Sequence, residues 1–298
     1  MTTAGPADQV HFGSGDHLCC VFDSDDSFRR NAVAFLAEGL ARGEQLLYLA
    51  DRASQDVLLD DLADLGDVAS LIETGTLRVH PLLEVYAAGA DDGIGRHDAT
   101  LRALLESSRR DGFSNCRVAL DVTPLVADTD RHQEFMAGEV AVGALIGDGS
   151  MAAMCGYDER LLGPVASDLA CVHSHRHVTR EASDPGFCLY VRDGWLHLAG
   201  EVDIVNVEQF RRAIAAVTGG LALGGDGRTH PRRPGEGAVD PVIDASGLSF
   251  IDIAATSELL GLRRLLGGTV RLVAPPSSLL LILRVLGAAH EFEVTTRK

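Results

Sequence analysis

The regular alternation of short apolar runs with longer amphipathic runs constrains this chain more than any other feature of its sequence. For example, "HLCCVF" at 17–22 has strand length, and the stretch 23–43 that follows has apolar residues at helical spacing and a closing Gly43. Strands that alternate with helices are typical of a parallel sheet with helices on both faces. The sequence therefore predicts an α/β fold. The predicted strands of this first half are 17–22, 44–51, 76–83, 116–123 and 150–157, and the predicted helices are 23–43, 54–66, 97–111, 130–147 and 159–170.

The alternation lapses over 172–186, a polar stretch that contains the turn signal Asp184-Pro185-Gly186. We therefore predict two domains, residues 1–180 and 185–298. The second opens with two strands joined by Asp193-Gly194, a dipeptide that is favoured in tight hairpins. Its predicted strands are 187–192, 195–200, 241–246, 269–275 and 291–294, and its predicted helices are 205–217, one from about 254, and 277–288.

A glycine-rich insertion at about 218–240 separates the first helix of the second domain from the strand that follows. Its composition predicts a flexible loop. It also carries basic side chains in an acidic protein, so it could serve as an electrostatic docking arm for an acidic partner. These side chains are Arg228, His230, Arg232 and Arg233.

Charge and apolar content argue against two classes of partner. The chain of 298 residues carries a formal net charge of −17, whereas binding of nucleic acid needs clustered Lys and Arg. The longest apolar run near the end, 277–289, contains Arg284 and is too short to span a bilayer. The first residues lack the basic and apolar segments of a signal peptide. We therefore expect a cytoplasmic protein with no membrane partner. The six cysteines lack CxxC spacing and fit free thiols, which is consistent with a reducing compartment.

Three segments of the second domain carry a family resemblance: "LAGEVDIVNVEQFRRAI" (198–214), "VIDASGLSFID" (242–252) and "GGTVRLVAPPSSLLLILRVLG" (267–287). They resemble the STAS domain, the family of sulfate transporters and anti-sigma-factor antagonists. The resemblance implies a small mixed sheet flanked by helices, which binds an anti-sigma factor, its kinase or a related regulator by partner switching. The partner-binding surface would then include Asp203, Asp252, Ile253, Ala254, Thr256 and Ser257.

The resemblance fails at the position that is phosphorylated in antagonist members of that family. The residue after the aspartate that matches Asp252 is a serine there, but it is Ile253 here, and Ala254 follows. Thr256 and Ser257 are the nearest hydroxyls in the predicted helix, where residues of this type usually form local hydrogen bonds. The sequence therefore predicts control that either does not use phosphorylation or has moved to a displaced hydroxyl.

Four segments of the first domain carry a second resemblance: "GDHLCCVFDSDDSF" (15–28), "FLAEGLARGEQLLYLAD" (35–51), "RVALDVTPL" (117–125) and "AMCGYDERLLG" (153–163). They resemble the MEDS sensory domain, named from methanogens and methylotrophs. The resemblance implies a RecA-like or KaiC-like fold that has lost its nucleotide chemistry and senses small molecules.

The residues themselves also argue against nucleotide chemistry. No GxxxxGK[ST] follows the strand 44–51. The carboxylates of Asp51, Asp56, Asp60 and Asp61 would repel a triphosphate unless a cation intervened. Asp121 ends a strand as a Walker-B aspartate would, although an aspartate there is more often a cap. With no recognisable catalytic triad either, we expect a protein that is not an enzyme and that has no catalytic residues.

One group of candidate ligand-sensing residues lies in the first strand. His17 and Cys19 are expected on one face of it and Cys20 on the other. Buried core thiols are the simpler interpretation. The alternative is a thiol-based or metal-based sensor in which His17, Cys19 and Cys155 converge at strand ends near Asp121, while the STAS-like half only forms a homodimer.

A second group, Cys171, His173, His175 and His177, lies at alternate positions of one short segment. Neighbours on the same face of a strand are about 7 Å apart, too far for all four to reach one ion. We therefore expect a solvated linker here, and we assign no metal ligands and no cofactor to the chain.

Overall fold

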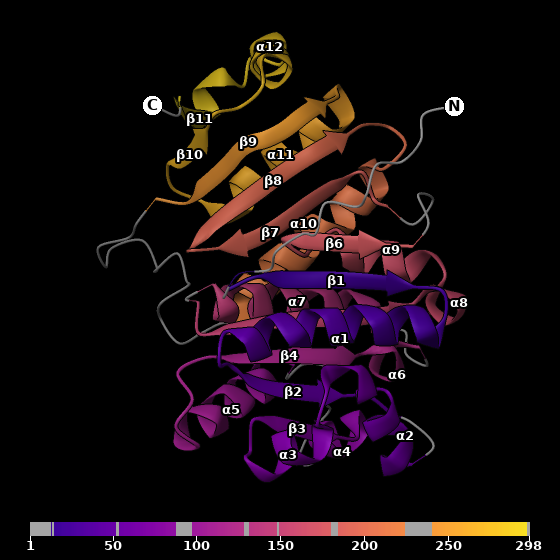
Figure 1. Ribbon diagram of the computed structural model, residues 1–298. Coiled ribbons are helices and arrows are strands. Elements are labelled where there is room, and N and C mark those ends of the chain that lie inside the picture. The colour runs from indigo at the N-terminus through magenta and orange to yellow at the C-terminus, as the bar shows by residue number, and fades with distance from the viewer. Residues whose placement is uncertain are drawn as a thin grey trace, which may run out of the picture.

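The computed structural model describes residues 13, 15–51, 54–87, 97–127, 131–147, 149–179, 184–223 and 240–296. Its first half is built on a sheet of six parallel strands in the order β3-β2-β4-β5-β1-β6 (Figure 1). The central strands are fully buried, as their apolar sequences require. The strands are β1 (His17–Phe22), β2 (Gln45–Leu49), β3 (Leu77–His80), β4 (Cys116–Asp121), β5 (Met151–Asp158) and β6 (His175–Val178).

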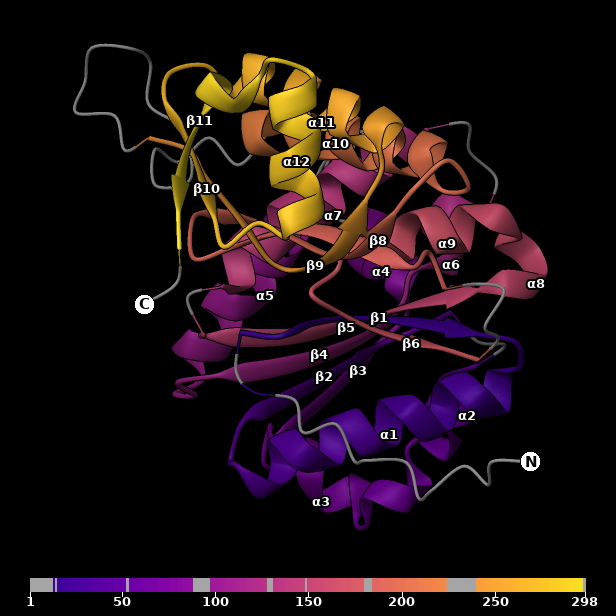
Figure 2. The ribbon, with the colours of Figure 1, turned by 90° about the horizontal axis from the view of Figure 1, so that it is seen from above.

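Helices cover both faces of this sheet. On one face lies α1 (Asp25–Ala41), which begins at the N-cap Ser24 and is followed by Gly43 with φ of +72°. With it lie α2 (Gln55–Asp60), η1 (Ala63–Leu65) and α3 (Val68–Glu73) (Figure 2). The opposite face is covered by α4 (Leu82–Ala87), α5 (His97–Arg110), α6 (Thr123–Val126), α7 (His132–Ile146), α8 (Glu159–Leu162) and α9 (Pro164–Ala170).

The second half is built on a mixed sheet of five strands in the order β11-β10-β9-β8-β7. Only β7 and β8 are antiparallel, and they are joined by Asp193 and Gly194, both with positive φ as a tight hairpin needs. The parallel sheet with helices on both faces and this small mixed sheet confirm the predicted fold class. The elements are β7 (Phe187–Arg192), β8 (Trp195–Val202), α10 (Val207–Leu223), β9 (Val242–Ile251), α11 (Ile253–Leu266), β10 (Val270–Val273), α12 (Ser277–Val285), η4 (Ala289–Glu291) and β11 (Phe292–Thr295).

The structure differs from the prediction in a few segments. The helix predicted over 159–170 is broken, because Gly163 has φ of +53° and Pro164 starts a new helix. The solvated linker predicted around 172–186 is wrong in its first part, where β6 pairs with β1. The basic residues of the insertion, Arg228, His230, Arg232 and Arg233, lie outside the described residues.

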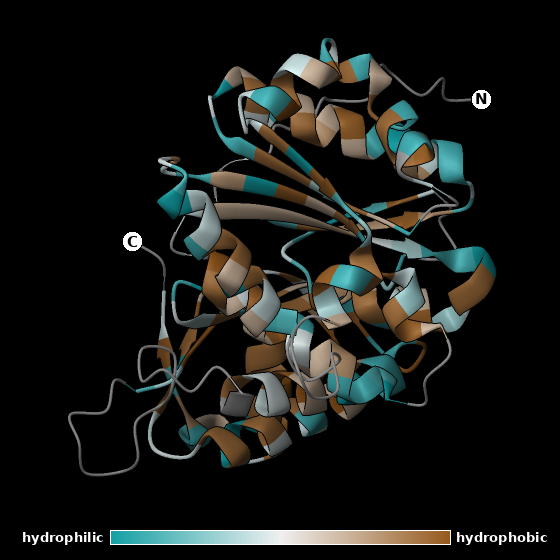
Figure 3. Cartoon of the chain, turned by 90° about the horizontal axis from the view of Figure 1, so that it is seen from below, coloured by the Kyte–Doolittle hydropathy of each residue, from teal (hydrophilic) through white to brown (hydrophobic). Residues whose placement is uncertain are grey.

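One apolar core runs from the first sheet through α7 into the second sheet. α10 packs directly on α7, so closely that a Cβ on Gly220 would lie 2.5 Å from the carbonyl oxygen of Ala137. Apolar residues gather on the strands and on the sides of the helices that face them (Figure 3). Among the described helices, none has both the length and the apolar content needed to cross a bilayer.

Candidate functional site

A buried carboxylate lies in the middle of α7. This helix is described over its whole length, and Glu139 is the only charged residue among its buried side chains, with none of its surface exposed. Oε1 accepts a hydrogen bond from the hydroxyl of Tyr157 and lies 3.4 Å from Nε2 of His97. The carboxylate is therefore held on one side, and its second oxygen faces a different set of groups.

Oε2 of Glu139 faces two imidazoles and a thiol. It lies 3.2 Å from Nε2 of His17, 3.5 Å from Nε2 of His173 and 3.7 Å from Sγ of Cys155. Sγ of Cys155 is in turn 3.5 Å from Nε2 of His17. The four donor atoms all lie within 4.8 Å of one another, and none of the four residues is more than 2% exposed. We call these four residues the His-Glu-Cys cluster.

Separate elements supply these side chains. β1 and β5 are neighbours in the sheet, and their register sets Cys19 of β1 opposite Cys155 of β5, with His17 two residues before Cys19 on the same face. Glu139 comes from α7 above this face, and His173 from the turn after α9. The fold thus collects donors that lie far apart in the sequence.

Burial sets the protonation states of the cluster. Burial first, and then the neighbouring His173, lower the pKa of His17 to about 4, so the imidazole of His17 is neutral at pH 7. Burial alone would raise the pKa of the Glu139 carboxyl, but His97, His17 and His173 together hold it well below its usual value. Burial and the nearby carboxylate raise the pKa of the Cys155 thiol. The interior therefore contains a carboxylate anion beside a neutral imidazole and a protonated thiol.

Some nitrogens around this anion lack hydrogen-bond partners. Nδ1 of His173 lies 2.8 Å from the carbonyl oxygen of Leu169, which can only accept, so Nδ1 carries a proton. Its Nε2 faces Glu139 and has no hydrogen-bond partner among the described residues, and the same holds for Nε2 of His97. Buried polar atoms without partners are rare, and each calls for a physical reason.

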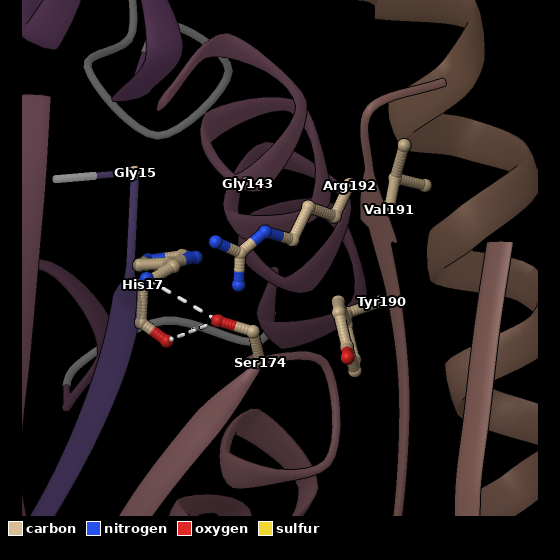
Figure 4. Close-up of a pocket in the computed structure, with 7 residues that line it drawn as sticks. All are labelled: Gly15, His17, Gly143, Ser174, Tyr190, Val191 and Arg192. Atoms are coloured by element: carbon tan, nitrogen blue, oxygen red, sulfur yellow. Dashed lines mark hydrogen bonds between the residues drawn. The ribbon is translucent and has the colours of Figure 1, made fainter. Parts of the chain in front are cut away.

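A small cavity borders the cluster where the two halves of the chain meet. Its volume is about 10 Å³, about the room that one water molecule needs. Figure 4 shows Arg192 reaching from β7 toward His17 and Ser174. The guanidinium of Arg192 donates to Asp16, the residue before His17, at 3.2 Å. Arg192, which belongs to the second half, therefore lines the cavity beside the cluster.

The structure brings together only part of the ligand-sensing group that the sequence predicted. His17 and Cys155 are in the cluster, and Cys19 is buried beside them in the same core. Asp121 is not in the cluster. Its Oδ1 accepts from the backbone N–H of Thr123 at 3.3 Å. Its charge adds to the effect of burial, which raises the pKa of Cys20 on the α1 face of the sheet.

The sequence analysis missed Glu139, His97 and Tyr157, and it placed His173 in a solvated linker. That placement is wrong, because His173 is fully buried. The prediction failed because it considered only ligands from one strand, whereas these donors come from several elements. A single carboxylate within the apolar stretch 135–146 is a signal that could have pointed to the site.

The partner-binding residues predicted for the second half lie around the start of α11. Asp252 is the N-cap, accepting from the backbone N–H of Ala255 at 2.8 Å, and its own N–H donates to the carbonyl of Val202 at 3.0 Å. This bond joins the ends of β8 and β9, so Asp203 lies beside Asp252 at one edge of the sheet. Ile253 is 57% exposed.

The two hydroxyls nearest this position are engaged within the helix. Thr256 is fully buried and donates to the carbonyl of Asp252 at 2.7 Å. Ser257 is exposed and donates to the carbonyl of Ile253 at 2.9 Å. Ala254, between Ile253 and the buried Ala255, is only partly exposed. These are the local hydrogen bonds expected for ordinary helix residues.

Comparison with known families agrees with this division of the chain. The model of the MEDS domain, the methanogen/methylotroph, DcmR sensory domain, matches residues 16–174, more than half of the chain. The chain belongs to the MEDS family. A STAS domain follows it at residues 189–298, and the order of the two confirms both resemblances. A sensory domain is therefore joined to a domain of the anti-sigma-factor-antagonist type, and all four residues of the His-Glu-Cys cluster belong to the MEDS half.

Two solved structures are distantly similar to the chain. The flagellar accessory protein FlaH from Methanocaldococcus jannaschii is 13% identical, with a TM-score of 0.39 over 62% of this chain and 76% of that one. A KaiC-like protein from Pyrococcus horikoshii is 14% identical, with the same TM-score and the same coverage. No curated protein matches the sequence.

Proposed function

We propose that this chain is a cytoplasmic bacterial signalling regulator and not an enzyme. Its MEDS half senses a small molecule or a protein state, and its STAS half binds an anti-sigma factor, its kinase or a related regulator by partner switching. Control does not use a phosphate at position 253. The STAS domain supports the class of partner, and the MEDS domain supports the sensory role.

The observation that carries this proposal is an exposed apolar surface at one edge of the STAS sheet. Ile204 and Val205 follow β8 and are 73% and 88% exposed, and Ile253 follows β9 on the neighbouring strand. Exposed apolar side chains that gather at one place mark a protein interaction surface. Because Ile253 cannot accept a phosphate, this surface is not blocked by phosphorylation at the usual position.

Introducing a negative charge at this surface, by the substitution Ile253→Asp, tests the proposal. Wild-type protein, Ile253→Asp and Leu265→Asp are used as baits in lysate of the native host, and captured proteins are identified by mass spectrometry. Leu265 is the matched control, since it is 68% exposed in the same helix but near its other end. An anti-sigma kinase is expected with wild type and Leu265→Asp, and about tenfold less of it with Ile253→Asp, because a charge in an interface must be desolvated. Equal recovery by all three baits, or none by any, contradicts the proposal.

The alternative is a metal-based or thiol-based sensor of redox state or ligand in which the STAS half only dimerises. The His-Glu-Cys cluster favours the metal-based form. The thiol-based form has less support, because all six cysteines are buried and the pKa values of Cys19 and Cys155 are raised well above the usual thiol value. A stable homodimer in light scattering, with no kinase recovered by any bait, would favour this alternative.

A further inference from the structure

We propose that His17, Glu139, Cys155 and His173 bind one divalent transition-metal ion of the zinc class. The donors would be Nε2 of both imidazoles, Oε2 of the carboxylate and Sγ of the thiolate. This site is independent of the proposed partner of the STAS half, so either proposal can fail without the other.

The spacing of the donor atoms matches a tetrahedral site. Zinc lies about 2.0–2.3 Å from nitrogen, oxygen and sulfur ligands, so its ligands lie roughly 3.3–3.7 Å from one another in a tetrahedron. Four of the six separations within the cluster fall between 3.2 and 3.7 Å and together involve all four residues, and the other two are at most 4.8 Å. The donors therefore lie close enough to surround one ion after small side-chain adjustments.

The charge of the cluster also fits a divalent cation. A buried carboxylate is costly unless a positive charge or several donors compensate it. When the ion binds, the Cys155 S–H bond breaks, a Sγ–metal bond forms and the proton leaves to solvent. One carboxylate and one thiolate then balance the 2+ charge of the ion. The ion also becomes the partner of the lone pair on Nε2 of His173, which has no hydrogen-bond partner among the described residues.

Groups around the cluster orient its donors. Tyr157 and His97 hold the other oxygen of Glu139, and the hydroxyl of Tyr86 contacts Nδ1 of His97. The carbonyl of Leu169 fixes the tautomer of His173 that leaves Nε2 free to coordinate. Such outer partners are usual at metal sites. Four buried protein donors leave no open coordination position, which is typical of a closed site and not of a catalytic one.

Cobalt titration of the full chain tests the site. The protein is stripped of metal with a chelator, dialysed and titrated with Co²⁺, and Zn²⁺ is then added. We expect one Co²⁺ per chain, the strong visible absorption of four-coordinate cobalt, and a near-ultraviolet band from thiolate-to-cobalt charge transfer. Zn²⁺ should remove both bands by displacing cobalt.

Matched variants assign the donors. Cys155→Ala should lose the charge-transfer band, and His173→Gln should bind more than about tenfold more weakly, since loss of an outer partner alone costs that much. Cys20→Ala, also buried but on the other face of the sheet, and His197→Gln, in the STAS half, should bind as wild type does. Circular dichroism verifies that each variant is folded. No stoichiometric binding by the wild type overturns the proposal whatever the variants do, and so does a charge-transfer band that persists in folded Cys155→Ala.

Discussion

At the scale of single residues, the hydrogen bond between Tyr157 and Glu139 stabilises a carboxylate that water cannot reach. Tyr48 and Asp61 form a similar phenol–carboxylate pair at 2.8 Å, but Asp61 is partly exposed. Loss of a donor costs more when the acceptor left behind stays buried. In metal-free protein, Tyr157→Phe should lower the free energy of unfolding by about 1–3 kcal/mol and Tyr48→Phe by only about 0.5–1.5 kcal/mol. Urea unfolding of both variants checks this, and equal losses would mean that water reaches Glu139.

The same residues show how far sequence alone could define the site. His17 and Cys155 could be named because each is a ligand-type residue in a strand that is otherwise apolar. Their convergence with Glu139 and His173 depends on strand order and on the placement of α7, which no spacing along the chain encodes. Asp121 was a reasonable candidate by its position at a strand end, but the fold uses it to hold the backbone at the start of α6.

At the scale of elements, the close approach of α7 and α10 joins the two halves of the chain. A Cβ at Gly220 would lie 2.5 Å from the carbonyl oxygen of Ala137 and 2.8 Å from Cβ of Val140, so α10 can approach only because residue 220 has no side chain. Gln133 also donates to the carbonyl of Arg212 at 2.9 Å, and Arg212 pairs with Asp168 of α9 at 2.8 Å. These contacts fix α10 beside the helix that carries Glu139.

Gly220→Ala should therefore destabilise the protein by about 1–3 kcal/mol, because the new methyl group forces the two helices apart. Gly261 is the matched control. It also lies inside a STAS helix, but a Cβ there would meet no heavy atom within 4 Å. Gly261→Ala should be neutral or stabilising by up to about 1 kcal/mol. Thermal unfolding of both variants measures the difference, and an unchanged Gly220→Ala would show that α10 is not held against α7 in solution.

The elements also show why most of the fold was predictable and part of it was not. Every strand predicted from an apolar run is present, because burial in a sheet requires such a run. β6 was missed because it is an edge strand, pairs only with β1 and keeps polar side chains such as His175 and His177. The helix predicted over 54–66 ends early at Asp60 and is followed by the short 3-10 helix η1. Apolar periodicity does not predict such a break.

At the scale of the whole molecule, α7 connects the His-Glu-Cys cluster to the STAS half. Glu139 faces the cluster, and Ala137 and Val140 of the same helix contact α10, which in turn packs on α11, the helix that begins at Ile253. Arg192 of β7 is tied to Asp16 beside the cluster. A change at the cluster therefore has a continuous packed route to the proposed partner surface. In contrast, α12 packs mainly on α11 and β9, away from this route.

Hydrogen exchange can show whether this route transmits a change. If Zn²⁺ fixes Glu139, local opening of α7 becomes rarer, and so does opening of the helix packed on it. Adding Zn²⁺ to metal-stripped protein should slow amide exchange in peptides of α7 and α10 and leave α12 unchanged. In Gly220→Ala, α7 should still be protected, but the effect on α10 should be lost, because the contact between the two helices is broken while the ligands are intact. Protection confined to α7 in the wild type would mean that the cluster stabilises the MEDS half alone and does not signal through α10.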